Sequence, residues 1–281
     1  MKIDIYQVDA FTDTIFKGQS SAVCPLDKWI DDSLMQKIAS ETNLSKTAFF
    51  VKKEDGIYDI RWFAPEHEIT LCDHAALASA YVIFNYFDKK SKKVTLNTLS
   101  ENIIIYKDKE LYLMSFPISM PTLYKQTNPI FSLAFGVEPL KVLKDKDYIL
   151  VYENQDIIKS LKPKIDILKN LDLRGVCITA RGKESDFVFK YFAPKLGMNE
   201  DLITGSIYSQ LAPYWSQVLD NKSLNATQLS KRKSEIICDL ENGNVIIRAK
   251  ATLFMKGEII IEERAYPRSE GETPTKLAIA V

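Results

Sequence analysis

Residues 60–65 read Ile-Arg-Trp-Phe-Ala-Pro, and residues 189–194 read Phe-Lys-Tyr-Phe-Ala-Pro. In each half of the chain the shared Phe-Ala-Pro ends a strand-like run. A polar loop and an apolar helix follow, and the two helices are predicted over residues 73–87 and 206–219. Strands are predicted after each helix. Three shared residues alone are weak evidence, but the common order of elements indicates an internal repeat.

The two predicted helices indicate how each repeat folds. Both are apolar nearly all round, and a helix of this kind is buried rather than laid on a surface. The sequence therefore predicts an α+β fold of two pseudo-symmetric domains, each a curved, mostly antiparallel sheet wrapped round a central helix. We expect residues 1–120 plus about 268–281 in the N-terminal domain, residues 121–267 in the C-terminal domain, and an active-site cleft between them.

Composition excludes several classes of protein. The 281 residues include 37 Lys and Arg and 37 Asp and Glu, so the net charge is zero, and phosphate binding by nucleic-acid proteins needs a basic excess. The longest apolar stretch, residues 75–84, is about half of the ~20 residues of a membrane span. With no signal-like start and scattered cysteines without a CxxC pair, we expect a cytoplasmic protein that binds neither nucleic acid nor membranes.

The start of the second helix is a candidate anion site. Two helix N-termini that face each other across a cleft direct free N–H groups and positive dipole ends at a ligand. Thr204, Gly205 and Ser206 suit such a site, because glycine allows close approach and serine can donate. Simple capping by Thr204 or Ser206 is the alternative, and the triplet alone favours capping.

The start of the first helix carries Asp73 and His74. An acid and an imidazole at a cleft are suited to proton transfer near neutral pH. Equally, Asp73 is an N-cap and His74 an exposed residue of the first turn. Asp201, ahead of the second helix, is either a matching acid or a solvated loop carboxylate.

No cofactor motif is present in the sequence. It contains no GxGxxG, GxxxxGK[ST] or GxSxG pattern, which removes support for nucleotide binding and serine hydrolysis. His67, Cys72 and His74 match no common zinc spacing. We therefore expect neither a metal nor an organic cofactor.

Ordered sequence pieces extend nearly from end to end: Val8-Asp9-Ala10-Phe11-Thr12, Phe16-x-Gly18, Ala22-Val23-Cys24, Glu41-x-Asn43-Leu44-Ser45-x-Thr47-Ala48-Phe49, Arg61-Trp62-Phe63-x-Pro65, Leu71-Cys72-x-His74-Ala75, Phe192-Ala193-Pro194, Glu200-Asp201-x-x-Thr204-Gly205-Ser206 and Leu211-Ala212-Pro213-Tyr214-Trp215. In these pieces the chain resembles the PhzF family of phenazine-biosynthesis isomerases. The resemblance implies a diaminopimelate-epimerase-like fold, cofactor-free proton transfer and, commonly, a homodimer.

The resemblance also implies site residues, and this sequence departs from the family at some of them. His74, Asp201 and Gly205-Ser206 match the family pattern. Lys46 stands where the family has its general base, a Glu, and Asp73 stands where the family has a Gly. The loss of one acid and the gain of another suggest that Lys46 and Asp73 form a close pair.

Two interpretations of these departures remain open. In the first, the protein is a cofactor-independent isomerase or epimerase acting on a small amino- or hydroxy-carboxylate, with Asp73 as a relocated base and Lys46 stabilising the developing enolate. In the second, it is a catalytically silent homologue that binds a small metabolite or serves as an assembly partner. The candidate catalytic residues are Lys46, Asp73, His74 and Asp201. The candidate substrate-binding residues are Gly18, Gln19, Ser20, Thr204, Gly205 and Ser206.

Overall fold

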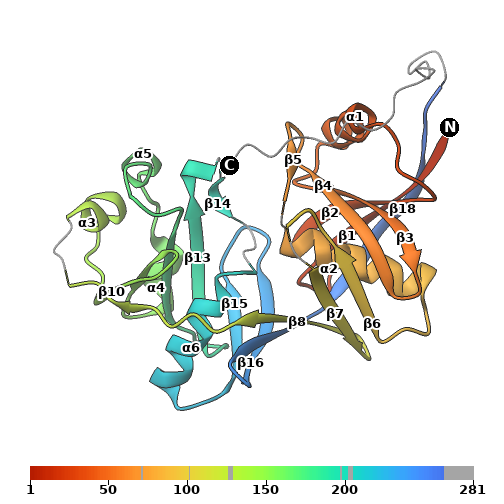
Figure 1. Cartoon of the computed structure of the whole chain (residues 1–281). Helices are drawn as coiled ribbons and strands as arrows, with labels where there is room; N and C mark the ends of the chain where they lie inside the picture. The colour runs from red at the N-terminus through yellow and green to blue at the C-terminus, as the bar shows by residue number, and fades with distance from the viewer. Residues whose placement is uncertain (71, 101, 126–128, 197, 202–204, 263–281) are drawn as a thin grey trace.

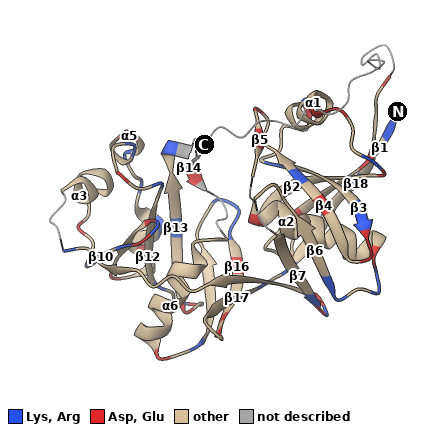
Figure 2. Ribbon diagram, viewed as in Figure 1, with Lys and Arg blue, Asp and Glu red and all other residues tan. Residues whose placement is uncertain are grey.

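The computed structural model describes residues 1–70, 72–100, 102–125, 129–196, 198–201 and 205–262. Figure 1 shows these residues as two lobes. The first lobe contains the first half of the chain and the strand β18, and the second lobe contains most of the second half. Basic and acidic residues are both scattered over the two lobes (Figure 2), and their numbers balance.

The first lobe is built mainly of strands. Its strands are β1 (Lys2–Ala10), β2 (Gln19–Leu26), β3 (Thr47–Glu54), β4 (Ile57–Phe63), β5 (Glu68–Ile69), β6 (Lys93–Asn97), β7 (Asn102–Asp108), β8 (Leu111–Pro117) and β18 (Ala251–Ile260). Its helices are α1 (Asp32–Thr42) and α2 (Asp73–Val82), and α2 continues as a π-helix over Ile83–Phe87.

The second lobe has the same kind of content. Its strands are β9 (Thr122–Leu123), β10 (Lys141–Lys144), β11 (Tyr148–Val151), β12 (Val176–Arg181), β13 (Phe187–Ala193), β14 (Met198–Asp201), β15 (Ser223–Gln228), β16 (Ser234–Glu241) and β17 (Asn244–Ala249). Its helices are α3 (Ile130–Phe135), α4 (Gln155–Ser160), α5 (Ile165–Leu168), a 3₁₀ turn at Pro194–Leu196 and α6 (Tyr208–Leu219).

The strand pairings show the internal repeat directly. In the first lobe β2 pairs with β3 in parallel, β3 with β4 antiparallel, and β4 with β6 in parallel across α2. In the second lobe β11 pairs with β12 in parallel, β12 with β13 antiparallel, and β13 with β15 in parallel across α6. Antiparallel ladders of three strands follow in each lobe, β6–β7–β8 and β15–β16–β17. The prediction of an α+β fold with two similar, mostly antiparallel units is confirmed.

The chain crosses from the first lobe to the second and later returns. After β8 the chain enters β9, which pairs with β10 of the second lobe. After β17 it enters β18, which pairs with β1 of the first lobe. The ladders of the two lobes are joined where β8 pairs with β17. Residues 251–260 were expected in the second domain and form β18 beside β1, while the predicted return near residue 268 lies outside the described residues.

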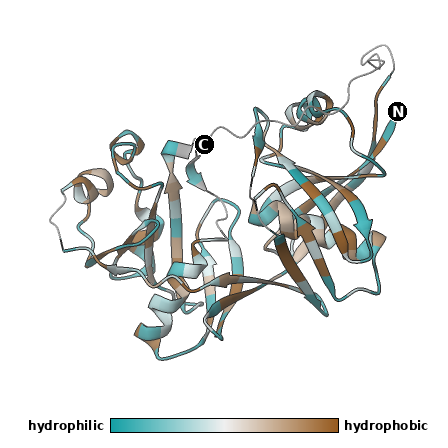
Figure 3. Cartoon of the chain, viewed as in Figure 1, coloured by the Kyte–Doolittle hydropathy of each residue, from teal (hydrophilic) through white to brown (hydrophobic). Residues whose placement is uncertain are grey.

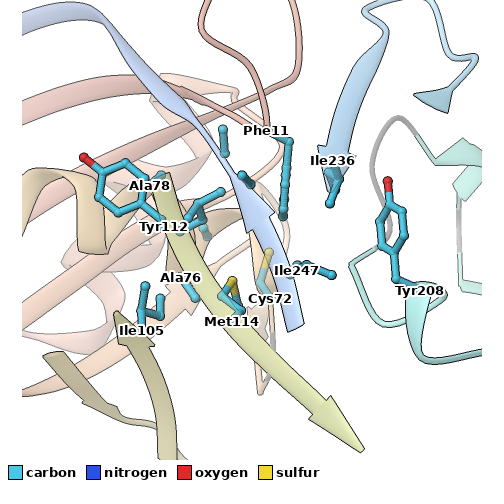
Figure 4. Packing of buried hydrophobic residues seen from close by; sticks show 14 of the residues in the cluster. Phe11, Cys72, Ala76, Ala78, Ile105, Tyr112, Met114, Tyr208, Ile236 and Ile247 are labelled. Atoms are coloured by element: carbon cyan, nitrogen blue, oxygen red, sulfur yellow. The ribbon is translucent and has the colours of Figure 1, made fainter. Parts of the chain in front are cut away.

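A helix lies at the centre of each lobe. In α2 almost every side chain is buried, including Leu77 and Ala78, and its contacts run to the strands of the first lobe. The first two turns of α6 are likewise buried, and it packs on β15, β16 and β17. One hydrophobic cluster contains side chains of both helices (Figure 4). Figure 3 shows the hydrophobic stretches in the surrounding strands.

Pro213 lies inside α6 without ending the helix. Proline has no backbone N–H, so the carbonyl four residues earlier loses its helical donor. That carbonyl belongs to Ser209, and it accepts a hydrogen bond from the amide of Ser119, 3.0 Å away, in the segment between β8 and β9. The connection between the lobes therefore satisfies the group that the proline leaves open. None of the described helices is long and apolar enough to cross a membrane.

Candidate active site

The starts of the two central helices meet at Asp73 and Gly205. Asp73 is the first residue of α2, and Gly205 lies just ahead of α6. A β-carbon at position 205 would lie 2.5 Å from Oδ2 of Asp73 and 2.7 Å from its Cβ. The Asp73 side chain therefore packs directly on the Gly205 backbone, where any other residue would collide with it. Two residues singled out from sequence, 132 positions apart, are in contact.

His74 lies one residue further into α2 and is buried. Its Nε2 atom lies 3.4 Å from Oγ of Ser45, and its Nδ1 atom lies 3.4 Å from Sγ of Cys72. Burial and, secondarily, the charge of Lys46 lower the pKa of His74 to about 3. Both causes oppose a charged imidazole, so His74 is neutral at neutral pH. The alternative of an exposed first-turn histidine is wrong.

Gln19 and Ser20 reach His74 through Ser45. Nε2 of Gln19 donates a hydrogen bond of 2.8 Å to Oγ of Ser45, which in turn donates to the Ser20 carbonyl oxygen. This places two of the predicted substrate-binding positions on one hydrogen-bonded chain with the imidazole.

Gly18 lies at a contact between the lobes. Its amide donates to the carbonyl oxygens of Arg232 and Lys233, and its own carbonyl accepts from Nε of Arg232 at 2.8 Å. The same guanidinium forms an ion pair of 2.9 Å with the buried Asp9. The φ angle of Gly18 is +63°, and a β-carbon there would collide with the Ala10 carbonyl oxygen. Glycine is thus required by both backbone conformation and space.

The predicted ion pair between Lys46 and Asp73 is not among the ion pairs of the described residues. The charge of Lys46 acts on His74, one residue further along α2. A cation on which the charge of Asp73 acts is Arg174. The charges of the two residues that depart from the family pattern therefore act on different groups, Lys46 on His74 and Asp73 on Arg174.

Two further predicted residues fall in or beside the part of the chain that is not described. Asp201 is the last residue of β14, and its backbone pairs with Tyr191 of β13. Thr204 lies outside the described residues. Ser206 is half-buried ahead of α6, and its Oγ lies 3.5 Å from Nη2 of Arg174.

A buried acid, Asp147, was missed from sequence. It is fully buried, and its two oxygens accept four hydrogen bonds, from Nε and Nη2 of Arg174, from the Tyr191 hydroxyl and from Nε2 of Gln210. Hydrogen bonding to Asp147 raises the pKa of Arg174, and the charge of Asp73 adds to this shift. A local signal existed: Asp147 and Arg174 each stand just ahead of an apolar run, and these runs form the parallel pair β11 and β12.

The described residues do not assemble a metal site. No group of three His, Cys, Asp or Glu side chains among them could hold a metal ion. Cys72 and His74 are in contact with each other, whereas His67 is exposed. The zinc arrangement considered from sequence is therefore absent from this part of the chain.

Comparisons with known proteins agree with this architecture. The fold is shared with a probable proline racemase from Agrobacterium radiobacter, at a TM-score of 0.58 and 9% identity over 93% of this chain and 94% of that one. At this identity the likeness concerns the α+β fold alone.

The chain belongs to the phenazine biosynthesis-like protein family (PhzC-PhzF), whose sequence model matches residues 8–257. A relative named as an uncharacterized isomerase of Pseudomonas aeruginosa is 41% identical over 92% of this chain and 99% of its own length. A crystal structure of a PhzF family protein from Enterococcus faecalis superposes with a TM-score of 0.89 at 39% identity, covering 93% of this chain and all of that one.

Proposed function

We propose that this protein is an isomerase or epimerase that moves a carbon-bound proton on a small amino- or hydroxy-carboxylate. Membership in a family with relatives named isomerases supports the type of reaction. The observation that carries the proposal is the contact of the Asp73 carboxylate with Gly205, where the starts of the two central helices meet. The proposed reaction uses neither a metal nor an organic cofactor.

Asp73 is the proposed base. A carboxylate loses its charge when it accepts a proton, so partial burial favours this step, whereas a buried imidazole would have to gain a charge. Asp73 is partly buried, and the pKa of His74 is lowered to about 3. We therefore assign proton removal to Asp73. The neutral His74 and Asp201 are assigned the placement of the substrate.

The negative charge that develops on the substrate needs stabilisation. Lys46 provides a cation near His74, and the start of α6 provides backbone N–H groups beside Gly205 and Ser206. Fixed charges and dipoles aimed at developing charge are the largest contribution in many proton-transfer enzymes. In this proposal Lys46 stabilises the enolate. The substrate is bound by Gly18, Gln19, Ser20, Thr204, Gly205 and Ser206. We further propose that the active form is a homodimer.

A second candidate function is a catalytically silent protein that binds a small metabolite. It is favoured by one observation, the presence of Lys46 where the resembling family has its general base. With a lysine at this position, the site has no base and can only bind a ligand, unless Asp73 takes over proton removal. The same experiment distinguishes the two candidates.

The test is solvent deuterium exchange into small amino- and hydroxy-carboxylates, followed by proton NMR. We expect the wild type to exchange the proton on the carbon next to the carboxylate of its substrate. Asp73→Asn should lower the rate by about 100-fold or more, as for loss of a general base. Asp13→Asn is the matched control, because Asp13 is an exposed acid paired with Lys250, and its rate should equal that of the wild type.

Two results would decide against the assignment. Exchange that survives Asp73→Asn would eliminate Asp73 as the base. No exchange by the wild type, together with exchange by the double variant Lys46→Glu with Asp73→Gly, would establish the silent homologue instead.

A further inference from the structure

Arg174 lies at the edge of the candidate active site without a role in the reaction proposed above. Nη2 of its guanidinium is 3.5 Å from Oγ of Ser206, ahead of α6, and the charge of Asp73 acts on it from α2. Its side chain is 39% exposed. A cation that solvent reaches is thus held where the two helix starts meet.

Asp147 holds this guanidinium in place. Nε and Nη2 of Arg174 donate to the two oxygens of Asp147 at 2.9 and 2.8 Å, which is a bidentate pair. The Tyr191 hydroxyl and the Gln210 amide fill the other acceptor positions at 2.8 and 2.7 Å. With four donors around it, the buried Asp147 has no free position for a ligand, and its role is to orient Arg174.

The Nη1 end of the guanidinium faces away from the pair with Asp147, which uses Nε and Nη2. Within the described part of the chain, no hydrogen bond from Nη1 of Arg174 is found. An arginine fork binds planar anions such as carboxylates through two parallel hydrogen bonds, which gives both energy and orientation. The Ser206 oxygen accepts from Nη2 of Arg174 at 3.5 Å, and its own hydroxyl hydrogen can be donated to the same anion.

The site also needs a counter-charge. A substrate carboxylate at the start of α6 would lie near the Asp73 carboxylate, since Asp73 packs on Gly205. Like charges at such range repel each other, and helix dipoles alone are worth less than a full charge. Arg174 is a cation that lies beside Ser206 and on which the charge of Asp73 acts.

We propose that Arg174 binds the carboxylate of the substrate and thereby selects acids over their neutral amides, and that Asp147 is the residue that positions it. This inference rests on the proposed function for the identity of the ligand as a substrate. It assigns carboxylate recognition to a side chain of the second lobe, opposite the base on the first.

The test compares each acid that exchanges deuterium with its primary amide, for example lactate with lactamide. We expect the wild type to prefer the acid. Arg174→Gln should raise the KM of the acid by about 10- to 100-fold, the usual loss for a charge-assisted pair, with a smaller change in kcat and none for the amide. Arg174→Lys should recover part of the loss, because it keeps the charge but not the fork.

Controls separate binding from folding. Arg174→Gln leaves Asp147 buried without its cation, which can unfold a protein. The double variant Arg174→Gln with Asp147→Asn removes both charges and should show the same loss of acid preference. Arg181→Gln is the matched control, since Arg181 is an exposed arginine at the end of β12 in the same lobe, and its KM should not change.

A binding measurement keeps this inference separate from the proposed reaction. Saturation-transfer NMR with acetate and acetamide should show acetate binding to the wild type and its loss in the double variant. This result would support carboxylate binding by Arg174 even if no compound exchanges deuterium. Equal acetate binding by wild type and the folded double variant, or no acetate binding by the wild type, would overturn the inference.

Discussion

His74 is one of only two histidines in the chain, and its burial makes stability depend on pH. Its folded pKa of about 3 lies below the ordinary value of 6.5. Between these values the unfolded chain binds a proton that the folded protein excludes, so the free energy of unfolding falls as the pH falls. The free energy of unfolding falls by about 1.4 kcal/mol per pH unit. This loss begins below about pH 6.5 and levels off near pH 3.

We expect urea unfolding between pH 7 and pH 4 to show this loss in the wild type and a shallower dependence in His74→Gln. The exposed His67 provides the control, and His67→Gln should keep the slope of the wild type. If the free energy of unfolding of His74→Gln depends on pH as steeply as that of the wild type, His74 is protonated in the folded protein and the prediction is wrong.

Gly205 and Asp73 are coupled by space. Because a β-carbon at position 205 would lie 2.5 Å from Oδ2 of Asp73, Gly205→Ala should destabilise the protein by about 1–3 kcal/mol, as overpacking does. Asp73→Gly removes the side chain with which this β-carbon would collide. In the Asp73→Gly variant, Gly205→Ala should therefore lower the free energy of unfolding only slightly. Gly257→Ala is the control, since a β-carbon there meets only Cγ2 of Ile5 at 3.9 Å. Additive free energies in this double-mutant cycle would refute the contact.

The two central helices differ in how far burial extends along them. Leu77 in α2 is fully buried, whereas Val218 in the last turn of α6 is 51% exposed. Leu77→Ala should lower the free energy of unfolding by about 2–5 kcal/mol through loss of packing and a residual cavity. Val218→Ala should change it by no more than about 0.5 kcal/mol. Similar losses for both variants in urea unfolding would contradict the burial of Leu77 in α2.

The strand pairings predict that the lobes unfold together. The β1–β18 ladder joins the start of the chain to a segment that follows the second lobe, and the β8–β17 ladder connects the lobes. Trp62 is buried in the first lobe and Trp215 in the second, so single-tryptophan variants report on each lobe separately. In each variant we expect the fluorescence midpoint in urea to coincide with the midpoint from circular dichroism. Separate midpoints within one variant would indicate lobes that unfold independently.

Local patterns in the sequence were enough to predict the repeat, the two central helices and the residues at their starts. Apolar character all round a helix reports burial, and a polar residue or glycine ahead of an apolar run reports a helix start, so Asp73, His74, Gly205 and Ser206 could be named from the chain alone. These signals arise within one element, where neighbouring residues share an environment.

Contacts between distant segments had no such signal. Three such contacts depend on where separate elements lie in the fold. They are the pairing of β18 with β1, the hydrogen bond from the Ser119 amide to the Ser209 carbonyl, and the ion pair by which Asp147 orients Arg174. The surroundings of Lys46 also depend on the tertiary structure. Its charge acts on His74, whereas the sequence predicts a pair with Asp73. Which charged side chains meet is settled by packing of the two lobes, because hydropathy periods specify which face of an element is buried and not which partner covers it.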